Sequence, residues 1–200
     1  MTLLSGNMKN HNSKPFFLVL FVLAFLERTV WDLGPNVELI TTVMVLASFL
    51  YPKYSLWGTL AVVILSDLVL GNSNIFLFTW SGFLIPAFLL SRPRLMKGFF
   101  CSPKRRGLIR VMGLGFSSNI FFYFWTNLGV WLLDSWGMYD KTVAGLVHCY
   151  INALPFLKNQ LVSSLVFIPL FYLAYKAIQS VNLPRNSFST LSARKIFIKD

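Results

Sequence analysis

The sequence predicts an all-α membrane protein built as a bundle of six transmembrane helices. Of its 200 residues, 56% are hydrophobic and only 12% are charged, and the mean hydropathy is +0.63. This apolar share exceeds that of an ordinary soluble domain, and the apolar residues occur in long blocks. The connections between the blocks are too short to contain a second hydrophobic core. We therefore expect one transmembrane domain over residues 15–178, preceded by a polar segment, 1–14, and followed by a basic tail, 179–200.

Charged residues, glycine and proline separate the apolar blocks. The first block leads directly into Glu27 and Arg28 without the small residues of a signal-peptide cleavage site, so we expect it to be retained. Gly34 and Pro35 separate it from the second block, which is short for a crossing that needs about 20 residues. In order, the expected spans are residues 15–31, 36–50, 54–71, 75–90, 108–133 and 156–177.

A polar turn and a short apolar segment lie between the fifth and sixth spans. The turn covers residues 134–141 and contains Gly137, and the apolar segment that follows covers residues 142–154. We expect this segment to end at Pro155, because proline interrupts a helix. The sequence is compatible with either a re-entrant or an interfacial helix at this place.

The distribution of positive charge orients the bundle. With six spans both termini lie on one side of the membrane, and that side collects all but three of the 18 Lys and Arg residues. Positive residues concentrate in cytoplasmic loops, so we expect this side to be the cytoplasm and the protein to be multi-pass in the bacterial cytoplasmic membrane. The net charge of +11 then reflects topology, and we expect no binding of nucleic acid. The basic residues on this side are Lys9, Lys14, Lys53, Arg92, Arg94, Lys97, Lys104, Arg105, Arg106, Arg110, Lys176, Arg185, Arg194, Lys195 and Lys199.

The opposite, outward half of the bundle is predicted to contain the functional site. All acids except Asp200 fall at the outward ends of their spans, namely Glu27, Asp32, Glu38, Asp67, Asp134 and Asp140. Polar side chains in a bilayer are costly unless they are paired, and intramembrane acids are therefore functional-site candidates. The predicted substrate-binding residues are Asn36, Glu38, Asp67, Thr126, Asn127, Trp131 and Asn152.

Each of these assignments has a structural alternative. Asp67 lies about one turn inside the end of an apolar span, where it contacts a ligand, pairs with Arg28 or ends the helix in solvent. If it contacts the ligand, Asp67→Asn should weaken binding by about 1.5 to 3 kcal/mol. Thr126 and Asn127 could instead form hydrogen bonds between helices, and this is the role we expect of Asn119.

The sequence contains no recognisable catalytic or metal-binding constellation. His148 and Cys149 are adjacent, but no further Cys or His follows at metal-ligand spacing, so we expect no metal and no cofactor. No nucleophile can be combined with a base or a metal, and we expect no enzymatic activity. There is no phosphate-binding GxxxxGK[ST] motif either, so any energy from ATP would come from another subunit.

Several stretches carry a resemblance to a known family. They are NVELITTVMVLASFLYPKYSLWGTLAVVILSDLVLG, FFYFWTNLGVWL, MYDKTVAGLVHCYINALPF and the region of residues 161–165. Together, over residues 28–175, the chain resembles an uncharacterised family of small bacterial six-span membrane proteins. That family is itself similar to the substrate-binding S components of energy-coupling-factor vitamin transporters. The resemblance implies a six-helix bundle with an outward-facing cavity, and a partner transmembrane coupling subunit with two ATPases. One difference is that Leu20 precedes Ala24 where S components have two small residues four apart.

From these observations the expected function is the binding and uptake of a small solute from outside the lipid bilayer. The acids make the outward half negative, which favours a cationic or zwitterionic substrate. The alternative is a non-transporting structural or assembly subunit of a membrane complex. In that case the polar side chains would hold helices together, and the basic cytoplasmic loop would bind a partner or anionic lipid.

Overall fold

The computed structural model describes residues 14–31, 33–35, 37–71, 74–92, 107–134 and 137–181, and these residues form helices joined by turns, with no β-strand. Residues 1–13 of the predicted N-terminal segment, most of the basic cluster of residues 92–110 and most of the basic tail lie outside the described residues. The helices are α1 (Lys14–Thr29), α2 (Ile40–Leu50), α3 (Pro52–Leu70), α4 (Phe76–Leu90), α6 (Gly107–Leu132) and α7 (Val143–Val181).

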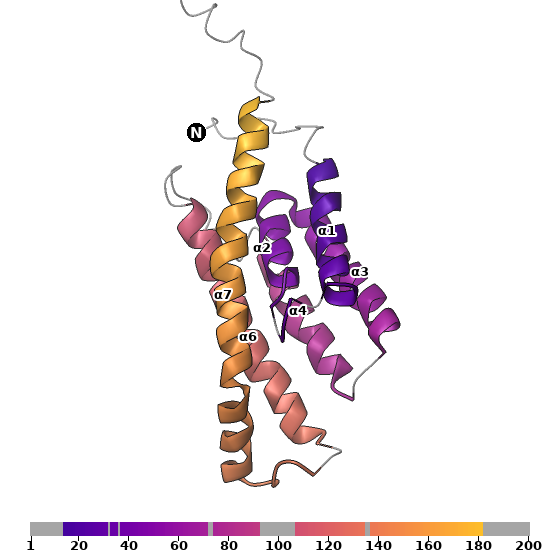
Figure 1. Ribbon diagram of the computed structural model, residues 1–200, viewed down its shortest axis with the longest axis vertical. Coiled ribbons are helices and arrows are strands. Elements are labelled where there is room, and N and C mark those ends of the chain that lie inside the picture. Colours follow the sequence, from indigo (N-terminus) through magenta and orange to yellow (C-terminus); the bar gives the residue numbers. More distant parts are fainter. Residues whose placement is uncertain are drawn as a thin grey trace, which may run out of the picture.

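Three of the helices are long and apolar enough to cross a membrane, which indicates a membrane protein. They are α3, α6 and, within α7, the stretch Val143–Ser180. The apolar helices α2 and α4 are shorter, with 11 and 15 residues, and α1 has 16. Figure 1 shows that α1 begins and α7 ends at the same end of the bundle, its upper end, whereas the turn between α6 and α7 forms the lower end.

Helix α2 occupies the centre of the bundle. It contacts α1, α3, α4, α6 and α7, and all of its residues from Ile40 to Ser48 are buried. A helix with few polar residues on any side can be enclosed by other helices at little cost, and the α2 sequence ITTVMVLASFL is of this kind. Because other helices surround α2, it does not need the length of a span that faces lipid.

In helix α1, the two positions at which S components have small residues, Leu20 and Ala24, face the inside of the bundle. Leu20 and Ala24 are 1% and 0% exposed and belong to the hydrophobic core, whereas Leu18, Val19 and Val22 are exposed. The position at which the chain differs from the S-component pattern therefore packs inside the bundle and is not available on the surface.

Helix α7 differs from the sequence prediction. It is continuous over 39 residues and passes through Pro155 and Pro169, so the prediction that residues 142–154 end at Pro155 is wrong. Proline removes one backbone hydrogen bond, but apolar helix-forming residues flank Pro155 on both sides and keep the neighbouring turns helical. Residues 143–154 are thus the first turns of α7, neither a re-entrant nor a separate interfacial helix. At about 1.5 Å per residue α7 is about 58 Å long, and with α6 it extends beyond the other helices at the lower end (Figure 1).

Candidate functional site

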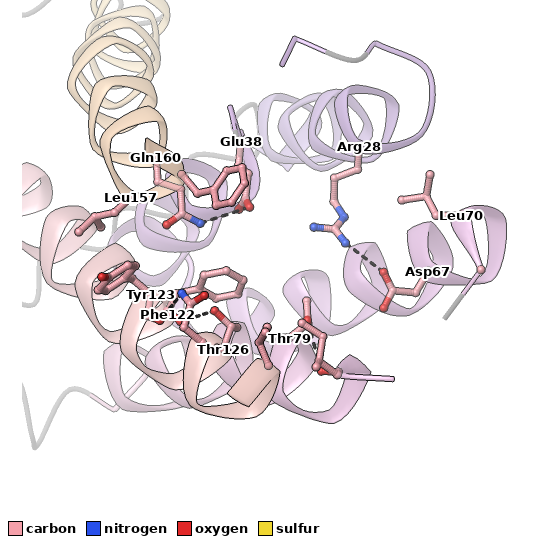
Figure 2. Close-up of a pocket in the computed structure, with 15 residues that line it drawn as sticks. Arg28, Glu38, Asp67, Leu70, Thr79, Phe122, Tyr123, Thr126, Leu157 and Gln160 are labelled. Atoms are coloured by element: carbon pink, nitrogen blue, oxygen red, sulfur yellow. Dashed lines mark hydrogen bonds and ion pairs between the residues drawn. The ribbon is translucent and has the colours of Figure 1, made fainter. Parts of the chain in front are cut away.

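A cavity of about 420 Å³ lies where the end of α1, the connection between α1 and α2, the end of α3, the start of α4, the C-terminal half of α6 and the N-terminal half of α7 meet (Figure 2). Its polar lining is Arg28, Glu38, Asp67, Thr79, Tyr123, Thr126, Asn127 and Gln160. Its other lining residues are Leu70, Gly71, Ile75, Phe122, Val130, Phe156 and Leu157. A pocket of this size, with a few polar groups in an apolar wall, has the general character of a small-molecule site.

Asp67 lies in the cavity wall with both carboxylate oxygens engaged. Arg28 Nη2 donates to Asp67 Oδ1 at 3.0 Å, and Trp80 Nε1 donates to Asp67 Oδ2 at 2.5 Å. Arg28 Nε also donates to Ser66 Oγ at 2.9 Å. The last turn of α3 therefore fixes the guanidinium of Arg28 from one side, and Asp67 has the Arg28 partner that the sequence left as an alternative.

Glu38 has only one of its two carboxylate oxygens paired. Gln160 Nε2 donates to Glu38 Oε1 at 3.4 Å, but Oε2 is buried and has no hydrogen-bond partner among the described residues. Glu38 as a whole is only 9% exposed. Figure 2 shows it on the α7 side of the cavity, across from Asp67.

Two contacts hold the α1–α2 connection, and with it Glu38, in place. The backbone N–H of Leu39 donates to Glu27 Oε2 at 3.2 Å, and Asn159 Nδ2 donates to the carbonyl oxygen of Pro35 at 2.9 Å. One contact comes from α1 and the other from α7. The carboxylate is thus held by the neighbouring helices, although it lies outside any helix.

Arg28 reaches into the cavity between these two carboxylates. A guanidinium has five N–H donors, and the described contacts use Nε and one N–H of Nη2. Figure 2 shows one amino group turned toward Asp67 and the other, Nη1, turned toward the interior of the cavity. No described residue accepts a hydrogen bond from Nη1, so this group remains available to a solute.

Helix α6 forms the remaining polar wall. Thr126 Oγ1 donates to the carbonyl oxygen of Phe122 at 2.7 Å, and Asn127 Nδ2 donates to that of Tyr123 at 2.8 Å. The Tyr123 hydroxyl donates to the carbonyl oxygen of Tyr150 in α7 at 2.6 Å. These donors are used within the protein. The side-chain oxygens of Thr126 and Asn127 can still accept hydrogen bonds from a solute.

The structure brings together only part of the predicted site. Glu38, Asp67, Thr126 and Asn127 line the cavity, whereas Trp131 and Asn152 do not. The Trp131 indole N–H donates to the carbonyl oxygen of Asp140 in the α6–α7 turn, and exposed Asn152 donates to the Tyr139 hydroxyl at 3.4 Å. Asn152 lies one turn before Phe156, the first α7 residue that lines the cavity, and Trp131 follows the lining residue Val130 but its indole contacts the α6–α7 turn. Asn36 lies outside the described residues.

Arg28, Gln160, Thr79 and Tyr123 also line the cavity, and the sequence prediction did not include them. Gln160 could have been found, because it is a polar residue within an apolar span, like Thr126 and Asn127. Arg28 was considered only as a partner of Asp67. The sequence offers no signal that would place Thr79 or Tyr123 in a site.

The remaining polar candidates do not converge on a centre. His148 is exposed on α7, and the Cys149 thiol is buried and donates to the carbonyl oxygen of Asn127 at 3.4 Å. Within the described part of the chain no three His, Cys, Asp or Glu side chains are close enough to share a metal ion. Asn119, which is 1% exposed, donates to Ser164 Oγ at 2.8 Å and to the carbonyl oxygen of Gln160 at 3.0 Å. Its predicted role as a link between helices is confirmed.

A second hollow adjoins the cavity. It measures about 380 Å³, is lined in part by the α1–α2 connection and shares Arg28, Glu38 and Leu70 with the first. Its other lining residues, among them Val30, Gly34 and Pro35, belong to the end of α1 and to this connection. The side chains of Arg28 and Glu38 therefore line both the cavity and the second hollow.

Comparison with known proteins gives a family but no activity. A family model described as a family of unknown function (DUF6580) matches residues 8–186. No curated protein and no solved structure matches the chain.

Proposed function

We propose that this chain, which belongs to the family of unknown function DUF6580, binds a small solute in the cavity and acts as the substrate-specific component of an uptake transporter. The observation that carries the proposal is a cavity of about 420 Å³ lined by Arg28, Glu38 and Asp67 inside a bundle of apolar helices. Charged groups in such a place are costly, and they occur in membrane proteins mainly where a substrate or an ion is handled. A purely structural bundle would be at least as stable with apolar side chains there.

The proposal includes six spans in the bacterial cytoplasmic membrane, with the cavity on the outer side. The cavity lies toward the end at which α1 ends and α2 begins. At the opposite end lie Lys53 in the first turn of α3, Arg110 in the first turn of α6 and Lys176 near the end of α7. By the positive-inside rule this basic end faces the cytoplasm, which makes the cavity accessible from outside.

Coupling to a transmembrane subunit with ATPases is the partner arrangement that the S-component resemblance implies. Leu20 and Ala24 are buried in this chain, so a coupling subunit would have to contact a different face of the bundle. The exposed apolar side chains of α1, Leu18, Val19 and Val22, face outward from the bundle and are open to lipid or to a partner helix.

A structural or assembly subunit is the second candidate, and one observation favours it. Asp67 is already satisfied by Arg28 and Trp80, and Asn119 links α6 to α7. Polar side chains that are paired in this way hold membrane helices together without any ligand. The two candidates differ in whether the cavity binds a small solute.

Native mass spectrometry of the purified full chain separates them. After incubation with a protein-free extract of small molecules, we expect the wild-type protein to carry a bound small molecule. We expect Thr126→Trp to lose it, because a large ring would fill the cavity. Phe124→Trp is the matched control, since Phe124 lies on the same helix and is exposed outside the cavity. If the wild-type protein carries no solute, or if Thr126→Trp carries as much as the control, the structural role is favoured.

A further inference from the structure

The cavity presents two groups of opposite charge, and each retains unused hydrogen-bonding capacity. On the α7 side, Glu38 Oε2 is buried and unpaired among the described residues, although Glu38 Oε1 accepts from Gln160. On the α3 side, Arg28 Nη1 is turned into the cavity while Nε and Nη2 are held by Ser66 and Asp67 (Figure 2). The structure shows no ion pair between Arg28 and Glu38.

The unpaired Oε2 of Glu38 can accept a hydrogen bond from a donor on the solute. A carboxylate oxygen accepts hydrogen bonds, and an oxygen that is buried without a donor is unfavourable because it has lost its contacts with water. The strongest donor that a small solute can offer is a protonated amine, because both partners are then charged.

The Nη1 amino group of Arg28 can still donate hydrogen bonds to an acceptor. Guanidinium groups bind carboxylates well, because the parallel N–H groups match the two oxygens. Asp67 occupies only one side of the guanidinium, through Nη2, and does not use Nη1. A carboxylate in the cavity would contact Arg28 without displacing Asp67.

We propose that the solute is a small zwitterion whose ammonium group donates to Glu38 and whose carboxylate accepts from Arg28. This inference rests on the proposed function, and it narrows the cationic or zwitterionic class that the sequence suggested. A simple cation would leave Arg28 Nη1 unused, and a simple anion would lie beside the Glu38 carboxylate. The remaining wall includes Ile75, Phe122, Phe156 and Leu157, which suits an apolar side chain. Amino acids with apolar side chains are the simplest compounds of this class.

Three related probes test the charge requirement on the wild-type full chain in detergent or nanodiscs. They are L-leucine, its decarboxylated amine isoamylamine and its deaminated acid 4-methylpentanoate, and affinity is measured by calorimetry and by the rise in unfolding temperature. The other apolar amino acids are tested with their own amine and acid analogues. We expect at least one amino acid to bind more than about ten-fold tighter than both of its analogues, since each lost charge-assisted hydrogen bond costs about 1.5 to 3 kcal/mol.

Two variants locate the ammonium contact. Glu38→Gln should weaken binding of that amino acid about ten-fold or more and should leave binding of the acid analogue unchanged or stronger, because the amide no longer repels a carboxylate. The matched control is Asp140→Asn, which removes an exposed carboxylate outside the cavity and should change neither affinity. If Glu38→Gln does not fold, the comparison of the three probes on the wild-type protein still decides the question.

The outcomes distinguish this inference from the proposed function. Equal binding of an amino acid and its amine or acid analogue would overturn the zwitterion, and so would a panel in which no amino acid binds. If the extract instead yields a bound molecule with a single charge, the proposed function stands and the zwitterion inference fails. If the wild-type protein binds nothing from the extract or the panel, both fail.

Discussion

Arg28 is the only cation among the described residues that line the cavity, where it faces Glu38 and Asp67. It lies in the last turn of α1 and contacts Ser66 and Asp67 on α3, so one side chain both joins two helices and turns an N–H group into the cavity. The sequence showed that Asp67 needs a partner. It could not decide between Arg28 and a solute, because both arrangements satisfy the same buried carboxylate.

Replacing Asp67 by asparagine is expected to destabilise the fold. Arg28 would keep its charge but lose its counterion, and both side chains are largely buried, with 14% and 10% exposed. Breaking such a partly buried pair should lower the free energy of unfolding by about 2 kcal/mol, between the values for exposed and fully buried pairs. Denaturant unfolding in detergent measures it. In a double-mutant cycle with Arg28→Met, the two changes should cost clearly less together than the sum of the separate costs. Strictly additive costs would mean that the pair contributes nothing.

The hydrogen bonds from Asn119 of α6 to α7 can be tested in the same way. Asn119→Ala removes hydrogen bonds from α6 to Ser164 and Gln160 of α7, so we expect a loss of about 1 kcal/mol in stability. Ser118→Ala is the neighbouring control, because the Ser118 hydroxyl is also buried but donates only to Leu114 of its own helix. The control should be close to neutral in the same unfolding assay. Equal losses would show that contacts between the two helices do not explain the effect.

Among the helices, α1, α3, α4 and α6 begin and end within two residues of the predicted spans. Their ends are marked in the sequence by features such as the Pro52 turn, Gly71 and Asp134. The continuity of α7 could not be predicted, since the effect of Pro155 depends on whether the flanking turns are held by apolar surroundings. Asn152 lies in the segment that was expected to end at Pro155, and it belongs instead to the first turns of α7, outside the cavity.

Helix α6 provides a matched pair of glycines. A Cβ on Gly129 would lie 2.3 Å from Cγ of Phe78 and 2.8 Å from its Cβ, so the α4 backbone itself would have to shift. We expect Gly129→Ala to destabilise the protein by about 1 to 3 kcal/mol, the usual cost of overpacking. A Cβ on Gly113 meets nothing within 4 Å, so Gly113→Ala should be neutral or should stabilise by up to about 1 kcal/mol through helix propensity. Only Gly129→Ala should therefore lower the unfolding temperature. A shift of the same size for both would show that α4 and α6 do not pack this closely.

For the whole molecule, it is easier to predict which helix ends lie together at one end of the bundle than which residues line the cavity. Alternating helices and one-sided positive charge predict which ends lie together, because both follow from counting along the sequence. The cavity draws on five helices and on the α1–α2 connection, and no count along the chain shows which faces meet. Trp131 illustrates this limit: it directly follows Val130, which lines the cavity, but its own side chain contacts the α6–α7 turn.

The orientation of the bundle can be tested with single cysteines in a chain in which Cys101 and Cys149 are replaced by serine. Serine at 149 can keep the hydrogen bond to the carbonyl oxygen of Asn127. Met138, which is exposed in the α6–α7 turn, and Ser180, which is exposed near the end of α7, lie at opposite ends of the bundle (Figure 1). With a membrane-impermeant maleimide on intact cells, Met138→Cys should be labelled and Ser180→Cys should not, because the basic end faces the cytoplasm.

Permeabilised cells serve as the control for this experiment, since both cysteines should then react to a similar extent. If Ser180→Cys reacts in intact cells while Met138→Cys is protected, the bundle is inverted and the cavity faces the cytoplasm. Uptake from outside would then be excluded, although solute binding would not. If both react, or both are protected, in intact cells, α7 does not place its two ends on opposite sides of the membrane. The number of spans would then have to be revised, because α7 is the longest of the helices that are apolar enough to cross.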